Sequence, residues 1–177
     1  MSTPDDDHVE RVLAERARLL ARPLEEPDRR ALDDVVVLEA GGERYAIALT
    51  SVERVHPVDA VTVVPGLRPP WAGLVSLRGE ILPALDLPSY LGRPPAPAGA
   101  AAGRPAASCA IVAHGGLRVA LLSEAPVELA ARPEGGLSAP LTETVAPPGV
   151  VVGVTDDLLT IVDVATILAD PALVVDD

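Results

Sequence analysis

Side chains that could act in acid–base, nucleophilic or metal chemistry are scattered thinly along this 177-residue chain. The three histidines, His8, His56 and His114, lie far apart in the sequence and form no recognisable metal-ligand pattern. The single cysteine, Cys109, lies in an apolar run without a cationic neighbour that would lower its pKa and activate its thiol. No lysine is present for a Schiff base or a phosphate-binding loop. We therefore predict no catalytic residue, no metal site and no cofactor.

Two aspartates, Asp86 and Asp163, stand at a recurring position, since each follows an apolar strand and precedes a helical turn. An aspartate in that place accepts hydrogen bonds from the first free N–H groups of a helix. We interpret both as structural N-caps. The alternative from another class of protein is a small β-barrel enzyme that uses Asp86 or Asp163.

One charged segment interrupts an otherwise apolar stretch, GLVSLRGEILPALDL at 73–87. Two strands joined by a tight turn explain Gly79. Arginine recognises carboxylates with two parallel hydrogen bonds and is frequent at interface hot spots. One interpretation is that Arg78, at the head of the turn, is presented to a partner on a rigid base. The alternative is that Arg78 covers apolar surface with its stem or pairs with a nearby carboxylate such as Glu80.

Composition narrows the kinds of partner. The net charge is −12, all 14 basic residues are arginine, and only three residues are aromatic. Nucleic acids and anionic membranes require a basic surface, and single strands require stacking platforms, so both classes of partner are excluded. No apolar run approaches the roughly 18 residues of a membrane span, and no leader pattern is present. We expect a soluble cytoplasmic protein that does not insert into a membrane.

The elements that position these residues begin after a charged segment at 1–33. That segment has one apolar stripe with helical spacing, and we predict a helix that is either a solvated tail or a docking helix for a partner. The Pro/Ala/Gly-rich tract at 93–107 predicts a mobile loop. Residues 171–177 form the C-terminal tail.

Short β patterns fill the regions between, and they repeat. VVVLEAGGERYAIAL, with a turn at Gly41 and Gly42, realigns on CAIVAHGGLRVALL, and ILPALDLPSYL realigns on LLTIVDVATIL. The repeat predicts a mainly β chain of two similar small lobes, from the halves 34–92 and 108–170, each closing its own sheet. A short helix is expected at 165–169.

The residues of 73–87 are similar to the signature of CheW-like domains, in which a G-x-x-N-L-R-G motif precedes an apolar strand. LEAGGERYAIALTSVERV, VPGLRPPWAG and GVVVGVTDDLLTIVDVATIL resemble further blocks of that family, so the resemblance covers 34–170. It implies two five-stranded SH3-like β-barrels that share an apolar core. It also implies a non-enzymatic cytoplasmic adaptor between the chemoreceptor cytoplasmic tip and the regulatory domain of a CheA-type histidine kinase. Arg78 carries over as a receptor contact.

The sequence departs from the family pattern at the expected contact surface. Ser76 replaces the usual asparagine, and Glu53 and Arg54 stand where the family has V-x-E-I, so the acid moves by one place. In a strand that shift sends the side chain to the opposite face. The family's acid is thought to pair with the arginine of the motif, and Arg54 is expected instead to repel Arg78. The complete set of expected partner contacts is Glu53, Arg54, Val55, Ser76, Arg78 and Glu80. The alternative within binding proteins is a divergent member that docks on the kinase and modulates or insulates it.

Overall fold

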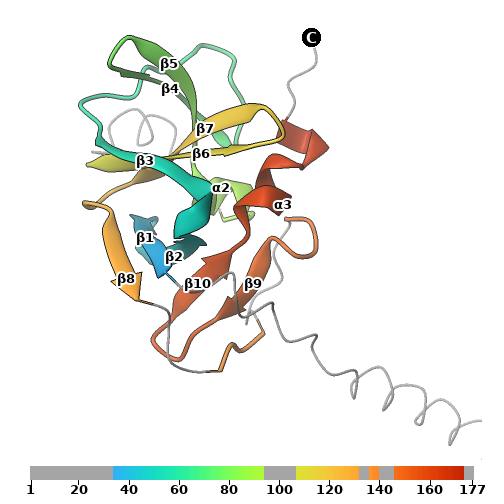
Figure 1. Ribbon diagram of the computed structural model, residues 1–177. Helices are drawn as coiled ribbons and strands as arrows, with labels where there is room; N and C mark the ends of the chain where they lie inside the picture. The colour runs from blue at the N-terminus through green and yellow to red at the C-terminus, as the bar shows by residue number, and fades with distance from the viewer. Residues whose placement is uncertain (1–33, 94–106, 132–135, 140–145, 174–177) are drawn as a thin grey trace, which may run out of the picture. The chain divides into compact units, whose positions relative to one another are not determined.

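The computed structural model describes residues 34–93, 107–131, 136–139 and 146–173 (Figure 1). The helix predicted within 1–33, nearly all of the loop predicted at 93–107 and the end of the C-terminal tail lie outside the described residues. The described strands form two five-stranded sheets, which confirms the predicted mainly β architecture. None of the described helices is long and apolar enough to span a membrane.

The first sheet has the order β8-β1-β2-β10-β9, and its strands are Asp34–Ala40 (β1), Glu43–Ala48 (β2), Glu128–Ala131 (β8), Val151–Val154 (β9) and Leu159–Val162 (β10). The second sheet has the order β3-β6-β7-β5-β4, and its strands are Val52–Pro57 (β3), Trp71–Leu77 (β4), Glu80–Leu85 (β5), Ser108–His114 (β6) and Leu117–Ser123 (β7). The short helices are η2 (Leu49–Ser51), α2 (Leu87–Tyr90), α3 (Val164–Leu168) and η3 (Pro171–Leu173).

The two halves of the chain exchange strands. The first sheet combines β1 and β2 with β8, β9 and β10, while β3, β4 and β5 join β6 and β7 in the second sheet. The prediction that each half closes its own sheet is therefore wrong. Two parallel pairings, β2 with β10 and β5 with β7, join the halves. The repeat identifies equivalent strands, but pairing between distant strands is set by tertiary packing that local sequence patterns do not encode.

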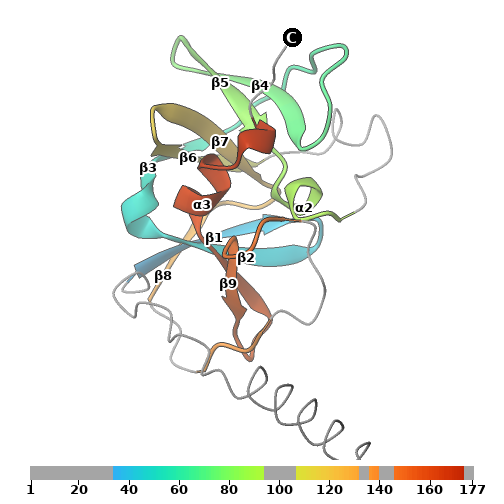
Figure 2. The same cartoon turned by 90° about the vertical axis from the view of Figure 1, so that its right-hand side faces the viewer.

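Strand β1 explains why so many strands read as continuous apolar runs. Successive side chains of a strand point to opposite faces. Val35 and Val37 lie in a core of the first sheet alone, whereas Val36 and Leu38 lie in a larger core to which both sheets contribute. Strand β6 divides its side chains in the same way between the second sheet and the shared core. Helices α2 and α3 lie between the sheets and pack into the shared core (Figure 1, Figure 2).

Each sheet is closed by one isolated bridge at its last strand. The bridge Thr62–Leu74 joins the segment after β3 to β4, and Ser138–Val154 joins the segment after β8 to β9. A glycine precedes the bridged residue of the last strand in both cases. A Cβ on Gly73 would lie 2.3 Å from the backbone oxygen of Thr62. Only glycine allows this close approach, so it is required for closure at that point.

Asp86 and Asp163 are the N-caps of α2 and α3. The Asp86 carboxylate accepts a hydrogen bond from the backbone N–H of Ser89 at 3.2 Å. Asp163 accepts two at 3.2 Å, from the N–H groups of Ala165 and Thr166. Both carboxylates thus satisfy the free donors at the start of a helix that packs into the shared core.

Candidate functional site

Arg78 lies at the tip of the β4–β5 hairpin. Leu77 pairs with Glu80, so Arg78 and Gly79 form a two-residue turn, and their φ angles are 52° and 87°. Positive φ at both central residues defines a type I′ turn, which favours Asn-Gly. An arginine in the left-handed region costs about 1 kcal/mol or more, because its Cβ crowds the following carbonyl oxygen. Arg78 is thus held in this turn at a local conformational cost.

The Arg78 side chain is exposed, and within the described part of the chain it makes no hydrogen bond or ion pair. Its nearest carboxylate in sequence, Glu80, is bound by two other arginines. Arg54 Nη2 lies 3.0 Å from Glu80 Oε2, and Arg118 Nη1 contacts Glu80 Oε1. The alternative that Arg78 pairs with Glu80 is therefore wrong. The exposed Arg78 guanidinium therefore has five N–H donors that no described residue accepts.

Four side chains form a charge cluster beside this turn: Glu53, Arg54, Glu80 and Arg118. Arg118 donates from Nη2 and Nε to Glu53 Oε2 at 2.6 and 3.0 Å. Hydrogen bonds from Arg118 to Glu53, and then to Glu80, raise the pKa of the guanidinium. Two cations and two carboxylates leave the cluster with no net formal charge, so the cluster does not offset the charge of Arg78.

Strand alternation places the charge cluster at one end of the second sheet's own core. Arg118 shares its face of β7 with Ala120, and Glu80 shares its face of β5 with Leu82. Ala120 and Leu82 both belong to the core of the second sheet. The charged side chains of the cluster therefore lie where this apolar core reaches the surface, and they cover that end of the core.

The structure corrects the prediction for Arg54. Arg54 was expected to repel Arg78 because it takes the place of the family's acid, but Glu80 neutralises it at 3.0 Å. A β-bulge also alters the expected geometry. Val52 pairs with Val112 and Arg54 with Ile111, so Glu53 is an extra residue in β3. A bulge re-aims side chains, and Glu53 and Arg54 consequently join one cluster although they are consecutive.

The outer face of the β4–β5 hairpin adds an apolar contribution. Ser76 is exposed and pairs in register with Ile81, whose surface is 67% exposed. Val55, on the edge strand β3, is 46% exposed. Ser76 and Val55 are expected contacts from the sequence, whereas Ile81 was missed, although its place directly after Glu80 assigns it to the opposite face. A cation, a hydroxyl and a large apolar side chain together suit an amphipathic protein segment that carries a carboxylate.

Arg118 is the cluster member that the sequence reading missed. A signal was present, since the GG turns align Arg118 with Arg44 in the repeat. Arg44 Nη1 lies 3.9 Å from Asp157 Oδ2 in the β9–β10 turn. Each sheet therefore directs an arginine from its central strand, β2 or β7, toward a carboxylate at the equivalent hairpin.

The groups considered for catalysis lie elsewhere. Cys109 is buried in the core of the second sheet, and burial raises the pKa of its thiol to about 11. In the described ranges, no three His, Cys, Asp or Glu side chains gather in a group that could hold a metal ion. His56 pairs in register with Cys109 on β6, away from His114 at the β6–β7 turn.

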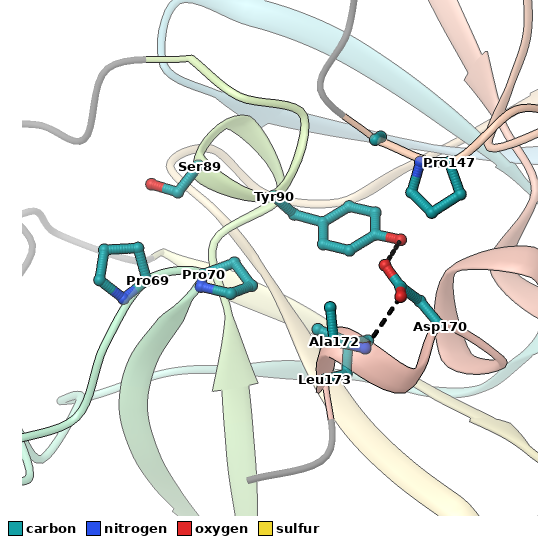
Figure 3. A pocket seen from close by; sticks show the side chains of 9 residues that line it. Pro69, Pro70, Ser89, Tyr90, Pro147, Asp170, Ala172 and Leu173 are labelled. Atoms are coloured by element: carbon teal, nitrogen blue, oxygen red, sulfur yellow. Dashed lines mark hydrogen bonds between the residues drawn. The ribbon is translucent and has the colours of Figure 1, made fainter.

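A pocket of about 190 Å³ lies where α2 meets the C-terminal segment (Figure 3). Pro69, Pro70 and Pro147 contribute apolar rings to its wall, and Ser89, Tyr90 and Asp170 contribute polar side chains. The Tyr90 hydroxyl donates to Asp170 Oδ2 at 2.8 Å, and burial followed by this hydrogen bond raises the pKa of Tyr90. The other carboxylate oxygen accepts the backbone N–H of Ala172 at 2.9 Å. Tyr90 and Asp170 thus bind one another, and their hydrogen bond ties α2 to η3.

Comparison with known proteins agrees with this architecture. A 62-residue stretch is 34% identical to the chemotaxis protein CheW of Bacillus subtilis (strain 168), over 35% of this chain and 40% of that relative. The crystal structure of the scaffolding protein TtCheW from Thermoanaerobacter tengcongensis superposes with a TM-score of 0.59 and 23% identity. It matches 78% of this chain and 89% of that one, which establishes the fold. Residues 34–172 match the family model of the CheW-like domain, and the chain belongs to that family.

Proposed function

We propose that this protein is a non-enzymatic cytoplasmic adaptor that couples chemoreceptors to a CheA-type histidine kinase. It binds the regulatory domain of the kinase with one surface and the cytoplasmic tip of a receptor with another. Family membership supports an adaptor role, since the similar proteins are a chemotaxis protein and a scaffolding protein. The single observation that carries the proposal is Arg78, which is exposed and makes no hydrogen bond or ion pair with any described residue, in a turn that disfavours it.

The receptor tip is the partner that we assign to the β4–β5 hairpin. Arg78 binds a carboxylate of the tip, and Ile81 packs against an apolar side chain beside it. The charge cluster supports this assignment because it occupies Glu80, which otherwise competes for Arg78. Ser76 contributes a hydroxyl that can donate or accept a hydrogen bond on the same face.

Arg78→Ala tests the assignment. We expect the affinity for the receptor tip to fall about 30-fold, the effect of losing an arginine hot spot of about 2 kcal/mol. Affinity for the kinase regulatory domain stays unchanged. Arg68→Ala is the matched control, because Arg68 is also exposed and has no ion pair with any described residue. Equal receptor affinity of Arg78→Ala and the control would contradict the assignment.

A second candidate function rests on Arg54, which stands where the family has an acid. In this function the protein docks on the kinase and insulates it from receptors. The two candidates differ in one measurement on the wild-type chain. An adaptor binds both the receptor tip and the kinase domain, whereas an insulator binds the kinase domain alone and lowers receptor-dependent kinase activity.

A further inference from the structure

The β9–β10 turn of the first sheet holds an unusual residue. The N–H of Thr155 donates to the carbonyl of Leu159 at 3.0 Å, and the N–H of Leu158 donates to the carbonyl of Thr155 at 3.0 Å. The hairpin therefore has a three-residue turn, which ends at Leu158 with a φ of 61°. The last residue of such a turn is left-handed and is commonly glycine.

Leu158 is unfavourable at this position for two reasons. Its left-handed backbone costs about 1 kcal/mol or more compared with glycine. Its side chain is 70% exposed, the largest exposed fraction of any big apolar residue in the described part of the chain. A single exposed leucine is ordinary, but non-glycine residues held in the left-handed region are concentrated at functional sites.

The surroundings of Leu158 define the chemistry that could cover it. Asp156 and Asp157 precede it in the turn, and both are exposed. The Thr155 hydroxyl donates to Asp157 Oδ1 and lowers the pKa of that carboxyl, so Asp157 remains ionised. Arg44 approaches Asp157 only to 3.9 Å, on the exposed side. Leu158 is thus an apolar knob beside two carboxylates.

The repeat supplies an independent reason to consider this turn. The β9–β10 hairpin is the equivalent of the β4–β5 hairpin, and Arg78 and Leu158 are the two described non-glycine residues with positive φ. One turn of each sheet therefore presents an exposed side chain from a non-glycine residue with an unfavourable positive φ. The two side chains differ completely in chemistry, so they suit different partners.

We propose that Leu158 anchors a contact with a second partner, one that Arg78 does not contact. In this contact Leu158 enters an apolar socket of the partner, and the socket has a cationic rim. The proposal rests on the adaptor function and assigns this contact to the kinase regulatory domain. The carboxylates of Asp156 and Asp157 pair with the cationic rim. A second copy of this chain is a poor occupant, because its net charge is −12.

Leu158→Gly separates binding from stability. This variant removes the knob and relieves the backbone, so we expect an unchanged or higher melting temperature and at least tenfold weaker binding to the kinase regulatory domain. Leu158→Met retains an apolar side chain and binds within about threefold of wild type. Leu129→Ser is the matched control, because Leu129 is a similarly exposed leucine of the same sheet, 68% exposed on strand β8.

Titration calorimetry with the kinase domain and with the receptor tip gives distinct outcomes. Loss of kinase binding in Leu158→Gly, with receptor binding retained, supports the proposal. If the wild-type chain binds the kinase domain and Leu158→Gly binds it equally well, the proposal is wrong while the adaptor function stands. If the wild-type chain binds neither probe, the adaptor function is wrong and the proposal fails with it.

Discussion

The two equivalent hairpins have the same place in the fold but different turns and different charges. In the second sheet, a two-residue turn presents Arg78, and Arg118 binds two carboxylates behind it. In the first sheet, a three-residue turn presents Leu158, and Arg44 makes one long contact to Asp157. The shared framework fixes where a side chain is displayed, and the turn residues decide what is displayed. Duplication of one unit can therefore produce two different contact surfaces.

The largest expected difference between the sheets concerns their closing glycines. Gly73→Ala places a Cβ against the backbone oxygen of Thr62 at a φ of 145°, so we expect a loss of about 3 kcal/mol or more in the free energy of unfolding. Gly153→Ala has no positive φ, and its Cβ would meet the Leu137 Cβ at 2.8 Å, so a loss of about 1 to 2 kcal/mol is expected. Urea denaturation of both variants checks the order, and equal losses would contradict it.

The next largest difference is expected between the arginines of the two central strands, Arg118 on β7 and Arg44 on β2. Arg118→Met removes the partner of Glu53 and leaves Glu80 with Arg54 alone, whereas Arg44→Met removes one loose contact. We expect the melting temperature to fall more for Arg118→Met, and the difference to shrink at 1 M salt because exposed ion pairs are screened. A larger effect of Arg44→Met would show that the charge cluster is not important for stability.

A smaller effect, of opposite sign, is expected for the turn that holds Arg78. Arg78→Asn places a residue suited to the type I′ turn at a φ of 52°, so the free energy of unfolding should rise by about 0.5 to 1 kcal/mol. Arg78→Ala, which keeps an ordinary Cβ in the same conformation, is the control and should change stability little. A decrease for Arg78→Asn would mean that the arginine stem stabilises the fold.

The smallest expected effect is a pH dependence confined to the β9–β10 turn. The hydrogen bond from Thr155 lowers the folded-state pKa of Asp157 below 3.8, so its stabilisation is complete above that pH and is lost as the pH falls through the folded-state value. We expect Asp157→Asn to melt below wild type at pH 7, and the difference to shrink as the pH falls below 3.8 through the folded-state pKa of Asp157. Asp156→Asn removes the same charge from the same turn and controls for net charge.

Much of the local structure could be predicted from the sequence, because local chemistry determines it. Gly41 and Gly42 form a turn with φ angles of 63° and 76°, and Asp86 caps a helix as its place before a helical turn suggests. The short helix predicted at 165–169 is present at Val164–Leu168.

Non-local structure could not be predicted in the same way. Strand β2 pairs with β10, which comes much later in the chain, and the repeat alone does not encode this pairing. A one-residue shift of the acid along a strand would normally move it to the opposite face. The bulge at Glu53 instead places Glu53 and Arg54 in one charge cluster. Arg118 lies 38 residues from Glu80 in sequence, so only the folded chain brings them together.

The strand exchange has a consequence for the order in which the molecule can be made. Strand β10 ends at Val162, and the first sheet places it beside β2, which ends at Ala48. During synthesis the chain emerges from its N-terminus, so the edge of β2 that pairs with β10 stays open until more than a hundred further residues have left the ribosome. Such distant pairings slow folding and expose strand edges meanwhile. The β1–β2 hairpin is therefore a segment that benefits from protection in the nascent chain.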